Sequence, residues 1–221
     1  MVVRRLPKQP TVLLGLSLLS LTGSLTSTPP TTSPPRPADA FAVYFRHDAV
    51  GRSMLRLVAT SCGTERWPVK TATDDDRGKI RHTPVATSIK YLDSRPEPSS
   101  RPQASRIKPA ELITYRVTAT LLEYKQEADN DYHLVLRDGR GRTMIAEIPA
   151  PACTGKISTE RAGIVAARRW FNRNYSPSSD FKSAVQRVTV TGVAFFDFLH
   201  GQTGVAPNGI ELHPVVSIRL S

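Results

Sequence analysis

The sequence has few of the features that identify common enzyme classes. It contains two cysteines among 221 residues, and aromatic residues make up 7% of it. It has no nucleophile elbow, no P-loop, no CxxC pair and no HExxH zinc motif. The classes that depend on those motifs are therefore excluded, and any function has to be sought in smaller local patterns.

The chain also lacks an apolar run long enough to cross a membrane as a helix. TVLLGLSLLSLTG, residues 11–23, is 13 residues long, against the ~20 that a membrane-spanning helix needs. It follows a basic segment with Arg4, Arg5 and Lys8, as in a secretory signal. We expect residues 1–27 to be a signal peptide or an N-terminal anchor. The protein is then exported, periplasmic or extracellular, and it touches a membrane only if this segment stays uncleaved.

Proline, by contrast, is abundant, with 18 residues that fall mostly in the first half of the chain. A Pro/Ser/Thr-rich stretch cannot bury a core, so we expect residues 28–61 to be a disordered tether. Within it Phe41, Val43 and Phe45 alternate, and the role of residues 41–61 stays open. Residues 62–110 contain isolated apolar anchors between prolines. We expect them to form an irregular arm that packs on the following domain.

The positive charge of the chain does not indicate a nucleic-acid partner. The formal net charge is +11, but residues 103–221 hold 15 basic and 11 acidic side chains. In residues 111–221, which are analysed below as a β-domain, the outward positions of the second and third predicted strands hold no aromatic residue that could stack on bases. The loop between the first and second of these strands is acidic, with Glu127, Asp129 and Asp131. We therefore expect the partner to be an unknown ligand or envelope component, and not nucleic acid.

The two cysteines, Cys62 and Cys153, are most simply a disulfide in an exported protein. The bond would join the arm to the later domain. A catalytic thiol is the alternative, but no histidine lies near Cys153 in the sequence.

The pattern becomes regular in residues 111–221. Alternating apolar residues predict strands in LITYRVTATLLEYK, YHLVLRD, TMIAEIP, QRVTVTGVAFFDFL and GIELHPVVSIRL. Between the third and fourth of these, Ile157, Ile164, Phe171 and Tyr175 form a helical stripe, with Ser158 or Thr159 as its cap. The order β-β-β-α-β-β is that of a five-stranded OB-fold barrel. We therefore expect a mainly β protein with one helix and an OB-fold-like domain over 111–221.

The same residues resemble a known family. The run from YRVTATLLEYKQEADNDYHLVLRDGRGRTMIAEIP to VTVTGVAFFDF is similar to the strand plan of the small exported bacterial OB-fold proteins of the BOF type. The ending FFDFLHGQTGVAPNGIELHPV is similar to a group of exported bacterial proteins. This resemblance implies a fold and an exported location, and no particular chemistry. The basic helix and residues 41–109 have no counterpart in the family.

The connection between the last two predicted strands is the candidate site, because in OB-folds this loop and the loop between the first two strands frame the ligand surface. Strand parity places Glu211 and His213 on the outward face, and Asp197 likewise. We expect a ligand-binding surface formed by His200, Gln202, Thr203, Asn208, Glu211 and His213.

Three interpretations of this loop remain open. Asp197, His200, Glu211 and His213 could bind a divalent ion or supply a general base, as in a metal-dependent hydrolase or nuclease. Gly201, Gly204, Asn208 and Gly209 could instead be turn residues only. The favoured interpretation is a non-enzymatic binding or envelope-interaction module, for which we expect no metal, no cofactor and no catalytic residue.

Overall fold

The computed structural model describes residues 40–47 and 53–221, with side chains from residue 61 onward. The predicted signal segment, residues 1–27, lies outside the described residues. Among the residues that are described, no helix has the length and apolar character needed to span a membrane.

Two strands lie in the range for which composition predicted a tether. β1 (Ala40–His47) pairs antiparallel with β2 (Ser53–Thr60), from Ala40 opposite Thr60 to His47 opposite Ser53. The sequence left the role of residues 41–61 open, and the structure describes these two strands in that part of the expected tether. Their sequences, AFAVYFRH and SMLRLVAT, are rich in aromatic and β-branched residues and contain no proline, a composition that favours strands.

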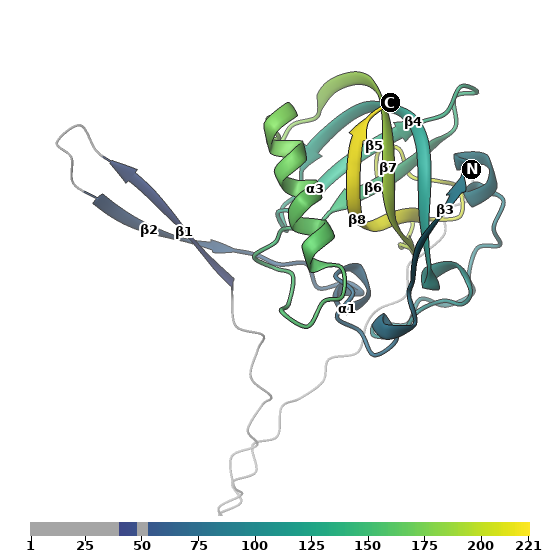
Figure 1. The fold of residues 1–221 in the computed structure, drawn as a ribbon, viewed down its shortest axis with the longest axis horizontal. Helices are drawn as coiled ribbons and strands as arrows, with labels where there is room; N and C mark the ends of the chain where they lie inside the picture. Colours follow the sequence, from purple (N-terminus) through teal and green to yellow (C-terminus); the bar gives the residue numbers. More distant parts are fainter. Residues whose placement is uncertain (1–39, 48–52) are drawn as a thin grey trace, which may run out of the picture. The chain divides into compact units, whose positions relative to one another are not determined.

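The body of the protein is a mixed sheet of six strands that curves into a ring (Figure 1). Its strands are β3 (Arg81–Thr87), β4 (Ile113–Gln126), β5 (Tyr132–Arg137), β6 (Thr143–Ile148), β7 (Lys182–Phe196) and β8 (Ile210–Leu220). The order is β3-β4-β5-β6-β8-β7, and an additional pairing of β4 with β7 closes the ring. The five strands predicted from alternation are β4 to β8, while β3 was not predicted.

The ring is not evenly formed. Pairing of β4 with β7 runs from Thr114–Val193 to Tyr124–Lys182, whereas the parallel contact of β6 with β8 is the single pair Ala146–Leu212. β3 lies parallel to β4 outside the closed ring. The structure therefore establishes a mainly β protein with a six-stranded mixed sheet, and the closure is partly open at β6.

The predicted helix is α3 (Arg161–Asn174), between β6 and β7 in the chain. Its apolar stripe is confirmed at Ile164 and Phe171, which are buried against the sheet. The prediction was wrong at the helix start, because the N-cap position is Glu160 without a side-chain cap. Ile157 precedes the helix and is exposed.

The inward faces of β4 to β8 form one apolar core, as the alternation predicted. The buried core residues include Val117, Leu121, Leu134, Leu136, Met144, Ile148, Val188, Val190, Ala194, Phe196, Ile210 and Leu212. Neighbours in this set are two or four residues apart on a strand, so they point to the same face and the side chains at the odd spacings point to the other.

That other face was expected to meet solvent, but part of it is buried too. Residues 61–112 contain the short elements α1 (Trp67–Lys70), η1 (Arg77–Lys79), α2 (Ile89–Asp93) and η2 (Ala110–Leu112). Arg66 and Lys70 at α1 lie over the ring of Phe195, and Ile80 after η1 packs with Val193, so this part of the segment covers the outward face. The buried side chains of α2 join the inward core instead. The expectation of one helix was therefore too low, since α1 and α2 are additional. This cover creates a second buried layer, and it is the layer that contains the polar side chains considered next.

Candidate functional site

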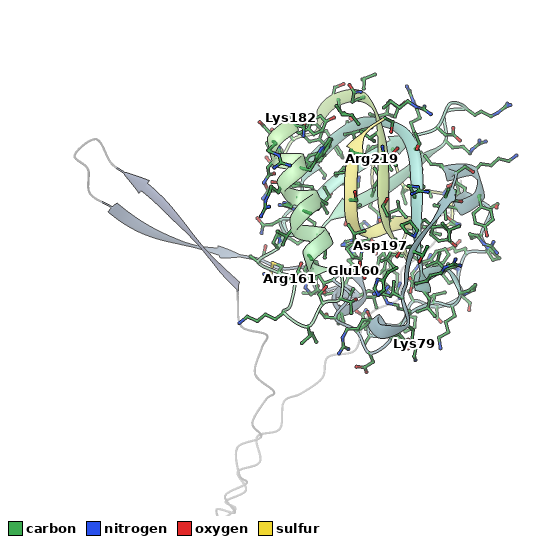
Figure 2. The ribbon with its side chains drawn as sticks, viewed as in Figure 1. Lys79, Glu160, Arg161, Lys182, Asp197 and Arg219 are labelled. Atoms are coloured by element: carbon green, nitrogen blue, oxygen red, sulfur yellow. A yellow bond between two sulfur atoms is a disulfide. The ribbon has the colours of Figure 1, made fainter. Side chains whose placement is uncertain are left out.

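A pocket of about 320 Å³ opens where three segments meet. Residues 63–65, Trp67 and Lys70 of the arm form one wall. Residues 127–129 of the β4–β5 loop form another, and Asp197, His200 and Gln202 of the β7–β8 loop form the third. His133 and Glu147 line it from the sheet. The pocket lies at one end of the ring: in Figure 2, Asp197 is well separated from Lys182 and Arg219.

The pocket is acidic although the chain as a whole is basic. Its lining contains the carboxylates Glu65, Glu127, Asp129, Glu147 and Asp197. Lys70 is the one lysine among its lining residues, which include no arginine, and its Nζ lies 3.2 Å from Asp197 Oδ2. Burial by itself would lower the pKa of Lys70, but Glu147, Glu211 and Asp197 raise this pKa above its ordinary value.

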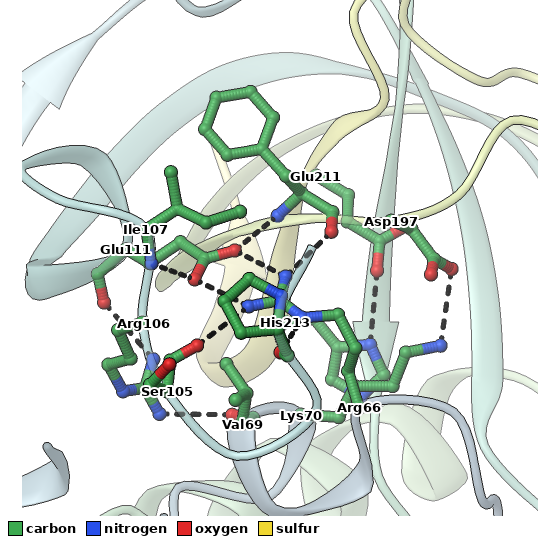
Figure 3. Close-up of polar contacts among 12 residues, drawn as sticks. Arg66, Val69, Lys70, Ser105, Arg106, Ile107, Glu111, Asp197, Glu211 and His213 are labelled. Atoms are coloured by element: carbon green, nitrogen blue, oxygen red, sulfur yellow. Dashed lines mark hydrogen bonds and ion pairs between the residues drawn. The ribbon is translucent and has the colours of Figure 1, made fainter. Parts of the chain in front are cut away.

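Two buried arginine–carboxylate pairs hold the arm that forms the first wall. Arg66 Nη1 and Nη2 donate to the two oxygens of Glu111 at 2.7 and 2.9 Å, and its other donors reach the carbonyls of Pro102, Ser105 and Phe196 (Figure 3). Arg106 is paired with Asp74 at 2.7 Å. Asp74 is therefore a structural partner in this layer.

The disulfide between Cys62 and Cys153 ties the start of the arm to the segment before α3, as predicted. The indole Nε1 of Trp67, five residues later, donates to the carbonyl of Cys153 at 3.3 Å. Gly63 lies against this ring, because a Cβ at Gly63 would come within 2.3 Å of Trp67. These contacts fix the arm wall of the pocket.

His133 forms the inner side of the pocket together with Glu147. The two residues face each other on β5 and β6, and His133 Nδ1 lies 3.1 Å from Glu147 Oε1 and 3.2 Å from Glu127 Oε1. Its Nε2 donates to the Thr203 carbonyl at 2.9 Å, since a carbonyl can only accept. Burial opposes the charged imidazole, but hydrogen bonds to Glu127 and Glu147 raise the pKa of His133 to about 10.

His213 lies deeper, without solvent contact, among three carboxylates. Its Nδ1 is 3.1 Å from Glu211 Oε1 and 3.1 Å from Glu147 Oε2, and its Nε2 is 3.3 Å from Asp131 Oδ2. Burial opposes its charged form, but these carboxylates raise the pKa of His213 well above its ordinary value. Burial, then the negative charges of Glu147 and Asp197, raise the pKa of Glu211 to about 7.

The predicted site residues therefore divide into three groups. Glu211 and His213 do point away from the core, as strand parity indicated, but they are buried and not exposed. They were expected at the surface because the sequence does not reveal that the arm covers this face.

Asn208 and Thr203 form the second group, with contacts inside the fold. Asn208 Nδ2 donates to the carbonyls of Leu92 and Arg95 at 3.0 and 2.9 Å, and its Oδ1 accepts from the amide of Ile210. Thr203 contributes its carbonyl to His133. The turn interpretation is thus supported for this part of the loop, where Gly201, Gly204 and Gly209 all have positive φ.

His200 and Gln202 form the third group and line the pocket. His200 is exposed, and its Nε2 lies 3.0 Å from Gln202 Nε2. Asp197 is turned toward Lys70. The single cluster expected from Asp197, His200, Glu211 and His213 is therefore not formed: Glu211 and His213 lie together in the buried layer, while Asp197 and His200 line the pocket.

The residues that complete the site were not selected from the sequence. They are Glu127, Asp131, His133 and Glu147. The structure brings Asp131 and Glu147 against His213, and it brings Glu127 and Glu147 against His133. Two of these residues could have been selected from the sequence, because strand parity places both His133 and Glu147 on the non-core face of neighbouring strands. The sequence could not show that β8 places His213 beside them.

Two sets of side chains in the described part of the chain have the spacing of metal ligands. They are Glu127, His133 and Glu147, and Asp131, Glu147 and His213; in each set one donor atom per residue lies within 4.8 Å of the others. Glu147 belongs to both. The first set faces the pocket and the second lies beneath it.

Comparison with family models finds no match to this chain, and comparison with curated proteins finds none either.

Proposed function

We propose that this protein is an exported binding module with an OB-fold-like barrel, and that it receives a positively charged ligand in the acidic pocket. The barrel type is supported by the strand order: β4, β5, β6, β8 and β7 form the ring in that sequence, and α3 joins β6 to β7. Five strands with a helix between the third and fourth are the OB-fold plan. The resemblance to BOF-type proteins, carried by the same segments, agrees with this proposal.

Export is supported by the disulfide. Disulfides persist in oxidising compartments and are rare in the reducing cytosol. The bond between Cys62 and Cys153 uses both cysteines of the chain and is compatible with a periplasmic or extracellular location. Mass spectrometry of protein taken from the cell envelope tests this: the mature chain should lack the N-terminal apolar segment and contain the bond.

The observation that carries the binding role is the acidic pocket itself. In OB-folds, ligands meet the surface framed by the loops that here join β4 to β5 and β7 to β8. Both loops border the pocket, and both supply carboxylates to it: Glu127 and Asp129 from one, Asp197 from the other. Carboxylates that converge in a concave site attract cations and raise their local concentration. An amine-bearing ligand therefore matches this pocket better than a phosphate or a nucleic acid does.

The test compares two ligands that differ in charge but not in length. A short glucosamine oligomer carries ammonium groups, and its N-acetylated form does not. We expect the charged oligomer to bind in calorimetry and the acetylated one not to bind. The double variant Glu127→Gln/Asp129→Asn should weaken binding, whereas Asp180→Asn, an exposed carboxylate outside the pocket, should leave it unchanged. Equal binding of both oligomers would contradict the charge argument.

A metal-dependent enzyme is the second candidate, and one observation favours it. Glu127, His133 and Glu147 face the pocket, so an ion on these three ligands would have an open position there, as catalytic zinc ions have. The test is hydrolysis of phosphodiester and ester substrates with added Zn²⁺ or Mn²⁺. Turnover that is lost in His133→Gln would support the enzyme, and a protein inactive with every metal would exclude it for these substrates.

A further inference from the structure

We propose that Asp131, Glu147 and His213 bind one divalent transition-metal ion beneath the pocket, and that Glu211 orients His213 for this role. The inference rests on the proposed function in one respect, since the acidic pocket is the route by which an ion reaches these side chains. It departs from the sequence expectation of a metal-free protein. The donor set, one imidazole with carboxylates, is that of Zn²⁺, Mn²⁺ and related ions.

Two buried atoms of the proposed ligand set make no hydrogen bond. Asp131 Oδ2 and His213 Nε2 are both buried, and neither completes a hydrogen bond within the described residues. Unsatisfied buried polar atoms are uncommon in folded proteins, and each calls for a partner. The remaining atoms of both side chains are occupied. Asp131 Oδ1 accepts from the Ala150 amide at 2.9 Å, and His213 Nδ1 lies 3.1 Å from both Glu211 Oε1 and Glu147 Oε2.

The second argument is the separation of these two atoms. His213 Nε2 and Asp131 Oδ2 lie 3.3 Å apart. Two ligands at metal distances of about 2.1 Å, arranged tetrahedrally, are about 3.4 Å apart. The atoms are thus already at the spacing that a shared ion requires. Glu147 completes the set, in which one donor atom from each of the three residues lies within 4.8 Å of the other two.

The third argument is the contact on the other side of the ring. Histidines that bind metals almost always donate their second ring N–H to a carboxylate or a carbonyl, which fixes the tautomer and the orientation. Glu211 Oε1 is 3.1 Å from His213 Nδ1 and has this position. Phe195 packs against the imidazole edge-on, with ring centroids 5.6 Å apart, and further limits its rotation.

The fourth argument is charge. Asp131, Glu147 and Glu211 are buried around His213, and Asp129 and Asp197 lie nearby in the pocket. These five carboxylates outnumber the basic side chains that contact them, which are Lys70 from α1, His133 from β5 and His213 itself. Buried charges are stable only when they are paired or coordinate a metal. A divalent cation supplies the missing positive charge.

The test uses the full-length protein, freed of metal with a chelator and then titrated with Zn²⁺. We expect one ion per chain. Asp131→Asn keeps the shape and the bond to the Ala150 amide, and it should weaken Zn²⁺ binding at least 100-fold. Glu211→Gln should weaken binding 10- to 100-fold, the range for residues that orient metal ligands. Glu127→Gln removes a ligand of the other set only, and it should change affinity less than threefold.

A second measurement does not depend on the folding of the variants. In ¹⁵N NMR of the wild-type histidine rings, Zn²⁺ should shift His213 Nε2 and leave Nδ1 protonated. Wild-type protein without saturable binding would overturn the proposal, and so would unchanged affinity in Asp131→Asn or loss of the ion in Glu127→Gln alone.

The outcomes also separate this inference from the proposed function. If Zn²⁺ fails to bind but the glucosamine oligomer still binds and is weakened by Glu127→Gln/Asp129→Asn, the metal site is wrong and the binding module stands. If the oligomer does not bind while Zn²⁺ does, the binding role is wrong and the metal site stands.

Discussion

Arg66 and Glu111 form a two-pronged ion pair without solvent contact, although 44 residues separate them in the chain. Glu111 also accepts from the amides of Ile107 and Phe196 at 2.6 and 2.8 Å. Arg66 lies over the ring of Phe195, 4.7 Å from its centroid, and has a left-handed backbone conformation with φ of 48°. This pair joins the arm to the end of β7 and so sets the position of the pocket wall.

Removal of one partner of this pair should be severely destabilising. Arg66→Met leaves the Glu111 carboxylate buried without its cation, and the loss of a partner from a buried pair costs about 3–5 kcal/mol. Chemical denaturation should show this loss. Lys79→Met, which breaks an exposed pair with Asp76, is the matched control and should leave the unfolding curve unchanged. Similar curves for both variants would show that the Arg66 pair does not hold the arm.

The disulfide should be a large contributor to stability. It joins residues 91 positions apart, and in the chain-entropy model closure of such a loop stabilises the folded state by about 4–5 kcal/mol. The double variant Cys62→Ser/Cys153→Ser should therefore have a much lower denaturation midpoint than the oxidised wild type. Addition of reductant should lower the wild type to the level of the variant and leave the variant itself unaffected.

The assignment of β7 side chains to the inward or outward face can be tested by placing an aspartate at one position of each kind. Val190 is fully buried in the core, and Arg187 on the same strand is exposed. Val190→Asp should unfold the domain, because an unpaired buried carboxylate costs several kcal/mol. Arg187→Asp should be tolerated. Thr189, an outward position by parity alone, is not a valid control because it is buried and bonds to Thr118 at 2.9 Å. Circular dichroism melting curves measure the stability of both variants. Equal stability would show that the assignment of inward and outward positions on β7 is wrong.

The β7–β8 loop should tolerate a methyl group at one glycine and not at another. Gly201 and Gly204 both have a φ of 83°, so alanine is strained to the same extent at either position. A Cβ at Gly201 meets nothing within 4 Å, but one at Gly204 would come within 2.5 Å of Val135. Gly204→Ala should therefore be less stable than Gly201→Ala by about 1–3 kcal/mol, the cost of overpacking. Equal melting temperatures would mean that the loop does not pack on β5.

Asp93 should reduce stability near neutral pH. Burial, the largest cause, raises the pKa of this carboxyl from 3.8 to about 6, against the nearby positive charge of Arg142. The folded state then binds a proton that the unfolded state has lost, so stability falls as pH rises from about 4 to 6. Asp93→Asn removes this effect.

We expect Asp93→Asn to stabilise the protein at pH 8 by up to about 1 kcal/mol, allowing for partial solvent screening. The gain should largely disappear near pH 3.5, where the wild-type carboxyl is mostly protonated in both states. Asp180→Asn, at an exposed carboxylate, should show no such pH-dependent difference. Urea unfolding at the two pH values measures both variants, and a gain that persists at low pH would rule out the ionisation explanation.

Much of the fold could be predicted from local patterns. The alternation of apolar and polar residues along β4 to β8 depends only on which side chains face the core. Apolar residues at alternate positions, such as Val188, Val190 and Phe196, show this directly in the sequence. The change from a two-residue to a helical spacing of apolar residues at α3 can also be seen in the local sequence. The helix start was misplaced because Ile157 fits the helical spacing yet lies outside the helix, and nothing local distinguishes the two cases. β3 was missed because it pairs with β4 across an intervening helix and loop, which no local pattern reports.

The site was only partly predictable, for a physical reason. Sequence parity correctly separated Glu211 and His213 from the core, because the direction of a side chain on a strand follows from its position alone. Burial of that face, however, requires Arg66, Lys70 and the disulfide to bring the arm over it. Asp131, Glu147 and His213 come from a loop and two different strands, and only closure of the ring places them together. The sequence by itself determined strands β4 to β8, helix α3 and the side on which each residue of those strands points, whereas the tertiary structure decided which polar residues share a buried layer.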